Sequence, residues 1–246
     1  MNILLTNDDG IDSDGLQKLA KNLRSNKGHR VFVLAPDTNR SGISHALALI
    51  NGPVKISAIG EDTWSCSGYP ADCVLMGLKS IIPVQIDVIL SGINRGANLG
   101  LDIIYSGTAS AARQASLSGY PAIALSLAGN APYNWDMAAS WSADHLEELL
   151  SHWRNEFFLN VNIPNNPVYP EGIAHTWLAT KSYQDFIRIV DAHDGSQWCF
   201  LGVGEEKIVS KTGSDCYTVS RNYVSVSSIR NYPSVLETPV LEPPVS

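Results

Sequence analysis

The sequence predicts an α/β protein in which helices cover both faces of a β-sheet. Short runs that are apolar throughout alternate along the first two thirds of the chain with longer segments whose apolar residues recur at helical spacing. Strands without polar alternation are typical of parallel sheets buried on both faces. At 246 residues the chain can build a large core, and α/β folds of this size often remain undivided. We therefore predict a single domain over residues 1–246.

The first three elements predict a strand–helix–strand unit with parallel strands. Asn2–Thr6 is a short apolar strand, and Asp14 can cap the helix that follows it. The apolar face of that helix consists of Leu16, Leu19, Ala20 and Leu23. Arg30–Ala35 is a second apolar strand, which Pro36 ends.

The same alternation continues towards the middle of the chain. Further helices are predicted at Pro70–Ile81, Thr108–Ser118 and Trp135–Arg154. Further buried strands are predicted at Ile86–Ser91, Pro121–Leu127 and Phe157–Ile163. Alternation of this kind is the signature of a sheet with helices on both faces.

Two stretches interrupt the alternation. His45–Ile59 turns at the sequence NGP and predicts a hairpin. From Ile173 onward the pattern is β-rich, which favours projecting hairpins or an extension over central parallel strands. The Pro-rich end, Glu237–Ser246, predicts a loosely ordered terminus.

Composition narrows the class of protein. The net charge of −7 argues against broad binding to nucleic acid or anionic membranes, both of which need a basic face. No basic stretch followed by an apolar core precedes the acids at Asp8 and Asp9, and no apolar run is long enough to cross a bilayer. The four cysteines, Cys66, Cys73, Cys199 and Cys216, lack C-x-x-C spacing and predict structural thiols in a reducing compartment. A cytoplasmic protein is expected.

Polar loops follow three of the predicted strands. The first loop carries Asn7, Asp8 and Asp9, the second Asp37, Asn39, Arg40 and Ser41, and the third Asn94 and Asn98 among Gly92, Gly96 and Gly100. Ligands of open α/β sheets bind where such loops meet, at the carboxyl ends of the strands. Adjacent carboxylates near neutral oxygens suit a hard divalent cation, Mg²⁺ or Mn²⁺. The six histidines are scattered singly, so a zinc site is not indicated.

The alternative for the first loop is a simple turn in which an Asp caps the helix, but turn chemistry does not require two consecutive acids. Ser106, Gly107 and Thr108 stand where the Ala-rich helix begins, and a helix N-terminus is a ready site for phosphate. There the alternative is that Thr108 is a plain helix cap. Neither a P-loop nor a G-x-G-x-x-G motif occurs, and Gly42–Ala46 lacks the second glycine of a nucleophile elbow. Together the loops indicate phosphate chemistry.

Seven motifs in order then resemble one family. They are LLTNDDGI, APDTNRSG, GYPADCV, SGINRGANLG, YSGTASAA, GYPAIALS and LNVNIP, and they cover Met1 to about Pro164. The set resembles the stationary-phase survival protein SurE family. The resemblance implies a metal-dependent 5′/3′-nucleotidase that hydrolyses nucleoside monophosphates, some members of the family also trimming polyphosphate. It also implies a Rossmann-like, mostly parallel sheet with a C-terminal β-hairpin extension, here about residues 173–232, that builds a homodimer or homotetramer.

The resemblance also assigns roles to residues of this chain. The metal ligands would be Asp8, Asp9, Ser41 and Asn94, and the phosphate-binding residues Asn98, Ser106, Gly107 and Thr108. Asp8 and Asp9 would also be catalytic, one of them taking a proton from the attacking water. Gln114 and Ala115 replace the Glu-Gly usual in the family, and Tyr69 lies in GYP where Gly-Thr-Pro is usual. These departures concern subunit contacts and substrate preference more than hydrolysis.

Two other functions fit the sequence less well. A phosphatase of the haloacid dehalogenase kind needs D-x-D-x-T after the first strand, which Asn7 and Gly10 do not fit. A non-catalytic nucleotide-binding or scaffold protein would be favoured by loss of Asp8, Asp9 or Asn94, and all three are present. The base, the choice between 5′ and 3′ esters and the identity of the proton-accepting Asp stay open at this point.

Overall fold

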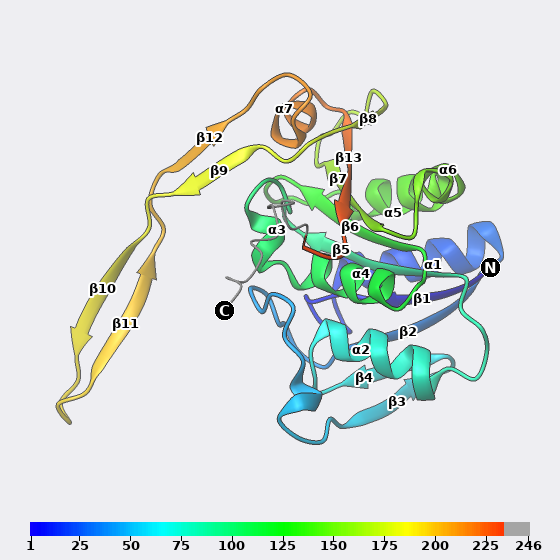
Figure 1. Ribbon diagram of the computed structural model, residues 1–246, viewed down its shortest axis with the longest axis horizontal. Helices are drawn as coiled ribbons and strands as arrows, with labels where there is room; N and C mark the ends of the chain where they lie inside the picture. Colours follow the sequence, from blue (N-terminus) through cyan, green and yellow to red (C-terminus); the bar gives the residue numbers. More distant parts are fainter. Residues whose placement is uncertain (234–246) are drawn as a thin grey trace, which may run out of the picture.

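The structure, a computed structural model, describes residues 1–233, without the side chains of residues 26 and 27. Within these residues a nine-stranded sheet forms the centre of the molecule (Figure 1). Its strands, in spatial order, are β3 (Ile56–Gly60), β4 (Thr63–Cys66), β2 (Arg30–Pro36), β1 (Asn2–Thr6), β5 (Val88–Arg95), β6 (Ala122–Ala128), β7 (Phe157–Pro164), β13 (Val224–Arg230) and β8 (Ile173–His175). The Pro-rich end predicted to be loosely ordered lies outside the described residues.

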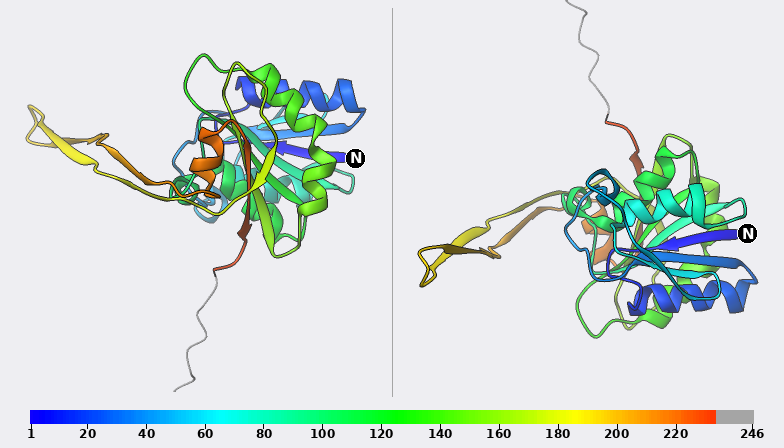
Figure 2. Two further views of the ribbon diagram at one scale, coloured as in Figure 1. Left: turned by 90° about the horizontal axis from the view of Figure 1, so that it is seen from above. Right: turned by 90° about the horizontal axis from the view of Figure 1, so that it is seen from below.

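Most of the sheet is parallel. Strands β4, β2, β1, β5, β6 and β7 run in one direction, whereas β3 and β13 are antiparallel to β4 and β7. Helices α1 (Asp14–Lys27), α5 (Trp135–Asp144) and α6 (Leu146–His152) cover one face, and α2 (Pro70–Met76) and α4 (Gly107–Leu117) cover the other (Figure 2). Ile3 and Leu5 enter the core on the first face and Leu4 enters the core on the second. Burial on both faces explains the unbroken apolar runs, and the predicted α/β class is confirmed.

Strand β1 occupies the position that creates the site. It pairs with β2 on one side and with β5 on the other, so Ile3 lies between Val31 and Val88. The loops after the two neighbouring strands therefore leave the sheet beside the loop after β1. Such a switch point in strand order opens a crevice at the carboxyl ends of the strands.

An arm, Thr180–Val209, projects from this body (Figures 1 and 2). It consists of β9 (Thr180–Tyr183) paired with β12 (Glu206–Val209), and β10 (Phe186–Asp191) paired with β11 (Gln197–Gly202). Every side chain of β10 is exposed. The outer half of the arm therefore does not pack against the rest of the chain within the described residues.

Polar contacts tie the root of the arm to the body. Asp102 of α3 (Asp102–Tyr105) accepts hydrogen bonds from Lys181 Nζ and from Tyr183 Oη, both at 2.5 Å. Asp215, buried at the start of α7 (Asp215–Ser220), accepts from the backbone N–H groups of Gly100 and Ala179, each at 2.7 Å. The arm is thus attached to the same loops that follow β5.

Two predictions about strands were wrong. His45–Ile59 forms no hairpin, because Asp72 accepts the backbone N–H groups of Ala48 and Leu49 and holds a short 3₁₀ turn (Ala48–Ile50) against α2. The strand within this stretch, β3, pairs with β4 instead. The segment NYVSVSSI does not project either, because it forms β13 of the central sheet, where Val224 and Val226 are buried in the core.

Several boundaries also differ from those predicted. The helix predicted at Trp135–Arg154 is broken at His145, whose Nδ1 and backbone N both lie within 3.0 Å of the Trp141 carbonyl oxygen. Ser13, and not Asp14, is the N-cap of α1, and Ser106 caps α4. Strand β5 continues four residues beyond the predicted end at Ser91, to Arg95. None of the helices within residues 1–233 is long and apolar enough to span a bilayer.

We predict that Asp215→Ala lowers the free energy of unfolding by about 2–4 kcal/mol, because it leaves buried N–H groups without an acceptor. Asp215→Asn keeps one acceptor oxygen and should cost less. Chemical unfolding followed by circular dichroism measures both. Asp136→Ala is the control. Among residues 1–233 this exposed carboxylate makes only a surface ion pair with Lys18, so its loss should change stability by less than about 0.5 kcal/mol. Equal stability of Asp215→Ala and the unaltered protein would contradict the prediction.

Candidate active site

Asp8 and Asp9 stand where β1 ends, and each is held by a different neighbour. Asp8 is 3% exposed, and its Oδ1 accepts a hydrogen bond from Thr108 Oγ1 at 2.5 Å. Asp9 is half-buried, and its Oδ2 accepts the backbone N–H of Arg95 at 2.9 Å. The loop itself is closed by Asn7, whose Nδ2 donates to the carbonyl of Gly10 at 2.9 Å. The two carboxylates are therefore oriented by β5 and α4.

The electrostatics of this pair are unfavourable without a cation. Burial raises the pKa of Asp8 above its ordinary value, the hydrogen bond from Thr108 opposes the shift, and the negative charge of Asp9 adds to it. In the part of the chain that the structure describes, neither carboxylate forms an ion pair with Lys, Arg or His. A cation bound beside Asp8 and Asp9 would lower the pKa of Asp8 and so oppose the effects of burial and of the Asp9 charge.

The loop after β2 and the end of β5 bring neutral oxygens to the same place. Ser41 donates both its backbone N–H and its hydroxyl to Asn39 Oδ1, at 2.7 and 2.6 Å. Asn94 donates its Nδ2 to the carbonyl of Gly96 at 3.1 Å. Because both side chains donate elsewhere, Ser41 Oγ and Asn94 Oδ1 keep lone pairs for a ligand.

These groups surround a small pocket of about 250 Å³, which we call the phosphate pocket. It is lined by Asp8, Ser41, Gly42, Asn94, Arg95, Asn98, Asp102, Tyr105 and Ser106. The tertiary structure thus brings together most of the residues assigned to metal and phosphate, from three loops and a helix N-terminus. Asp9 lies at the border of this pocket with a larger one.

The N-terminus of α4 contributes backbone donors. Ser106 Oγ accepts the N–H of Ala109 at 3.0 Å, so the first turn is capped by this side chain. Gly107 and Thr108 make no hydrogen bond from their N–H groups to a backbone carbonyl in the described residues. A Cβ on Gly107 would lie 2.6 Å from Asp8 Cβ, which only glycine avoids. Thr108 does not line the phosphate pocket, because its side chain is bound to Asp8.

Asn98 is positioned by its neighbours in the sheet. Its Nδ2 donates to Ser126 Oγ, and its backbone N–H donates to Asn162 Oδ1, both at 2.8 Å. The side chains of Asn160 and Asn162 in turn donate to the Asn98 carbonyl. This buried network leaves Asn98 at the wall of the phosphate pocket with its orientation determined.

The donor set fits a hard divalent cation. Asp8 and Asp9 each have one carboxylate oxygen without a side-chain hydrogen bond among residues 1–233, and Ser41 Oγ and Asn94 Oδ1 add two neutral oxygens. Mg²⁺ and Mn²⁺ prefer such oxygens, whereas softer metals prefer His or Cys. The described residues contain no group of three or more His, Cys, Asp and Glu suited to a metal, in keeping with a site of only two carboxylates.

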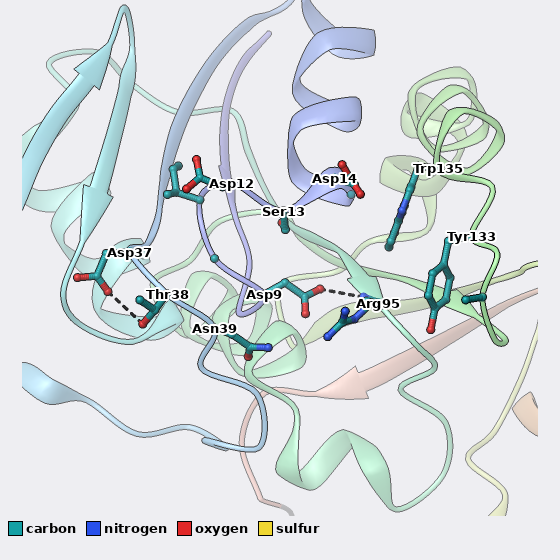
Figure 3. Close-up of a pocket in the computed structure, with 14 residues that line it drawn as sticks. Asp9, Asp12, Ser13, Asp14, Asp37, Thr38, Asn39, Arg95, Tyr133 and Trp135 are labelled. Atoms are coloured by element: carbon teal, nitrogen blue, oxygen red, sulfur yellow. Dashed lines mark hydrogen bonds between the residues drawn. The ribbon is translucent and has the colours of Figure 1, made fainter.

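A second pocket is about 710 Å³ in volume. Figure 3 shows the residues that line it. Arg95 lines both pockets, and the wall of the larger one also includes Asp9, Asn39, Tyr133 and Trp135. Sequence reasoning missed Arg95, Tyr133 and Trp135 as site residues. Their position along the chain was the available signal. Arg95 ends β5, Tyr133 lies in the loop after β6, and Trp135 begins α5 directly after that loop.

Comparison with known proteins agrees with this fold and identifies the family. A family model described as "Survival protein SurE" matches residues 3–185. The 5′-nucleotidase SurE of Pelobacter propionicus is 38% identical over 244 residues, covering 96% of this chain and 97% of that protein. The corresponding protein of Geotalea daltonii is 39% identical over 246 residues, covering 96% of each. The crystal structure of the SurE protein from Aquifex aeolicus superposes with a TM-score of 0.83 at 34% identity, covering 95% of each chain. The predicted family is confirmed: the chain belongs to the SurE family.

Proposed function

We propose that this protein is a divalent-metal-dependent phosphatase that hydrolyses nucleoside 5′- or 3′-monophosphates to nucleoside and phosphate. The observation that carries the proposal is the buried carboxylate of Asp8 beside Asp9, which has no cationic partner in the described residues and faces neutral oxygens next to a helix N-terminus. The names of the relatives, 5′-nucleotidase, support the nucleotide as substrate.

Mg²⁺ or Mn²⁺ would be held by Asp8, Asp9, Ser41 and Asn94. Bound there, the cation supplies positive charge that offsets the charge of the phosphoryl group as its ester bond breaks. Thr108 orients Asp8, and the backbone N–H of Arg95 orients Asp9. One of these two carboxylates takes the proton of the attacking water.

The chain's own donors would bind the phosphoryl oxygens. The N–H group of Gly107, in the first turn of α4, would supply a donor where the helix dipole favours an anion, whereas the N–H of Thr108 is directed at the carboxylate of Asp8. Asn98 and Ser106 line the same pocket and complete the predicted phosphate-binding set. Trimming of polyphosphate, the further activity that the resemblance implies, would use this pocket too and stays a prediction.

We place the protein in the cytoplasm. The support is the state of its cysteines, all four of which are free thiols, with Cys66 and Cys73 buried. Such thiols are typical of a reducing compartment.

Assembly through the arm is the last part of the proposal, with a homodimer or homotetramer as the product. The outer half of the arm exposes a set of large apolar side chains: Phe186, Ile187, Ile189, Val190, Trp198, Phe200 and Leu201. An isolated two-stranded hairpin is marginally stable and leaves two edges unpaired, so a second copy of the chain is the natural cover.

Metal removal tests the cation. After dialysis against a chelator the protein should lose hydrolysis of nucleoside monophosphates, and added Mg²⁺ or Mn²⁺ should restore it, because only oxygens of Asp8, Asp9, Ser41 and Asn94 are predicted to hold the ion. Phosphate release measured with and without each metal decides the point. Full activity in excess chelator would show that the site works without a cation.

Removal of either charge tests the carboxylates. In Asp8→Asn and Asp9→Asn, kcat should fall about 100-fold or more, a cost of roughly 3 kcal/mol in transition-state stabilisation. The fold should survive in Asp8→Asn, because Asn can still accept the hydrogen bond from Thr108. The metal-free variant should also melt higher than the unaltered protein at neutral pH. Burial raises the pKa of Asp8 from its ordinary 3.8, so in the unaltered protein ionisation of Asp8 lowers the stability of the fold as the pH rises. The difference in melting temperature between Asp8→Asn and the unaltered protein should therefore vanish at about pH 3, where Asp8 is protonated in the folded and the unfolded state.

Asp136→Asn is the matched control for this pair, since Asp136 lies on the surface of α5 and lines neither pocket. It should change neither turnover nor the pH dependence of melting. Near-normal turnover in both Asp8→Asn and Asp9→Asn would exclude a catalytic role for the two carboxylates.

Shortening of the arm tests assembly. Residues 185–204 are replaced by Asn-Gly, a two-residue turn that closes β9 onto β12 and keeps the contacts of Lys181 and Tyr183 with Asp102. The variant should show a lower molar mass by light scattering, because it lacks the exposed apolar strands. It should still bind metal. A full-length protein that is monomeric at micromolar concentration would contradict assembly through the arm.

A further inference from the structure

The larger pocket beside the phosphate pocket has no role in the chemistry described so far. Its volume of about 710 Å³ falls in the range of small-molecule sites, whereas the phosphate pocket, at about 250 Å³, lies below that range. The two meet at Arg95, which lines both, and at Asn39, which binds Ser41. A ligand whose phosphate sits at Asp8 would therefore extend past Asp9 into the larger pocket.

We propose that this larger pocket, the nucleoside pocket, receives the ribose and base of the substrate, with the base stacked on the aromatic pair Tyr133 and Trp135. This inference rests on the proposed function, since it places the nucleoside half of the same substrate. Its lining comes from the loops after β1, β2 and β6, from the end of β5 and from the first turns of α1 and α5.

The aromatic pair is built as a stacking surface. The rings of Tyr133 and Trp135 stack with centroids 5.2 Å apart and an angle of 29° between their planes, and both side chains are half-exposed. In the view of Figure 3 they lie on the opposite side of Asp9 and Arg95 from Asp37 and Thr38. Aromatic faces of this kind stack on any of the nucleobases, and each stacked base contributes about 1–3 kcal/mol of binding free energy.

The position of Trp135 is determined by α1. A Cβ on Gly15 would lie 2.9 Å from Trp135 Cζ3 and 2.1 Å from the carbonyl oxygen of Ile93. Glycine at this position thus allows the indole to pack against the start of the helix. The ring is held in place before a ligand arrives, so less conformational freedom is lost on binding.

The charge of the nucleoside pocket favours a neutral nucleoside. Four carboxylates, Asp9, Asp12, Asp14 and Asp37, line it against the one guanidinium of Arg95. Asp37 is paired with Arg40 at 3.0 Å, whereas Asp12 and Asp14 are exposed and make no ion pair in the described residues. Carboxylates accept hydrogen bonds from ribose hydroxyl and base amino groups, but they repel a second phosphate. Nucleoside monophosphates are therefore preferred over nucleoside bisphosphates.

The test compares Tyr133→Ala with Tyr133→Phe, which keeps the ring. Binding of adenosine, guanosine, cytidine and uridine to the metal-free protein is measured by calorimetry, and kcat/KM is measured for the monophosphate of the nucleoside that binds tightest and for ribose 5-phosphate, which has no base. Tyr133→Ala should lower nucleoside affinity and kcat/KM for the nucleotide about tenfold. Tyr133→Phe should stay within threefold of the unaltered protein. Ribose 5-phosphate hydrolysis should change less than threefold in either variant, which also shows that Tyr133→Ala folds.

The outcomes separate this inference from the proposed function. Nucleoside binding that depends on Tyr133, without hydrolysis of any nucleotide, would support the pocket and refute the nucleotidase. Two results would refute the nucleoside pocket but not the phosphatase. In one, hydrolysis is metal-dependent and Tyr133→Ala leaves kcat/KM for the nucleotide unchanged. In the other, Tyr133→Ala lowers kcat/KM equally for the nucleotide and for ribose 5-phosphate.

A separate measurement tests whether the negative charge of the nucleoside pocket disfavours a second phosphate. The unaltered protein should prefer adenosine 5′-monophosphate over adenosine 3′,5′-bisphosphate by tenfold or more in kcat/KM, and Asp12→Asn should narrow that preference. Equal use of the two substrates by the unaltered protein would refute the electrostatic part of the proposal.

Discussion

The burial of one negative charge, that of Asp8, is the constraint around which this structure is arranged. A carboxylate that is 3% exposed and adjacent to a second carboxylate is costly unless other groups stabilise it. Thr108 donates to Asp8 from α4, and Gly107 lets the helix approach because it has no Cβ. The raised pKa of Asp8 shows that these contacts offset the cost only in part. The remaining cost is what a bound cation would remove, so the same burial that weakens the metal-free fold prepares the site.

The sheet order makes this burial possible. Because β1 lies between β2 and β5, the loop after β1 is enclosed by the loops of both neighbours, and α4 covers it from the second face. Ser41, in the loop after β2, and Asn94, near the end of β5, both line the crevice beside it. A site at a switch point thus gathers side chains from neighbouring strands, each anchored on a rigid sheet.

The arm and the site share one element. Asp102 lines the phosphate pocket, and it is also the residue to which Lys181 and Tyr183 bind the root of the arm. Asp215 adds a second tie between the arm and Gly100, six residues before Ser106. A change in the arm that disturbs its root would therefore reach the helix N-terminus, whereas a change confined to β10 and β11 would not.

The sequence by itself determined the elements whose patterns are local. The apolar run of β1, the helical spacing in α1 and the acids at Asp8 and Asp9 were all readable, because burial on both faces and strand-end loops leave signals within a few neighbouring residues. Only the tertiary structure decided that β13 joins the central sheet, since its partner β7 is distant in the chain. It also decided that Asp72 holds the Ala48–Ile50 turn, and that Tyr133 and Trp135 share a pocket with Asp9. Those outcomes depend on which surfaces meet after folding, and no local pattern of residues encodes such contacts.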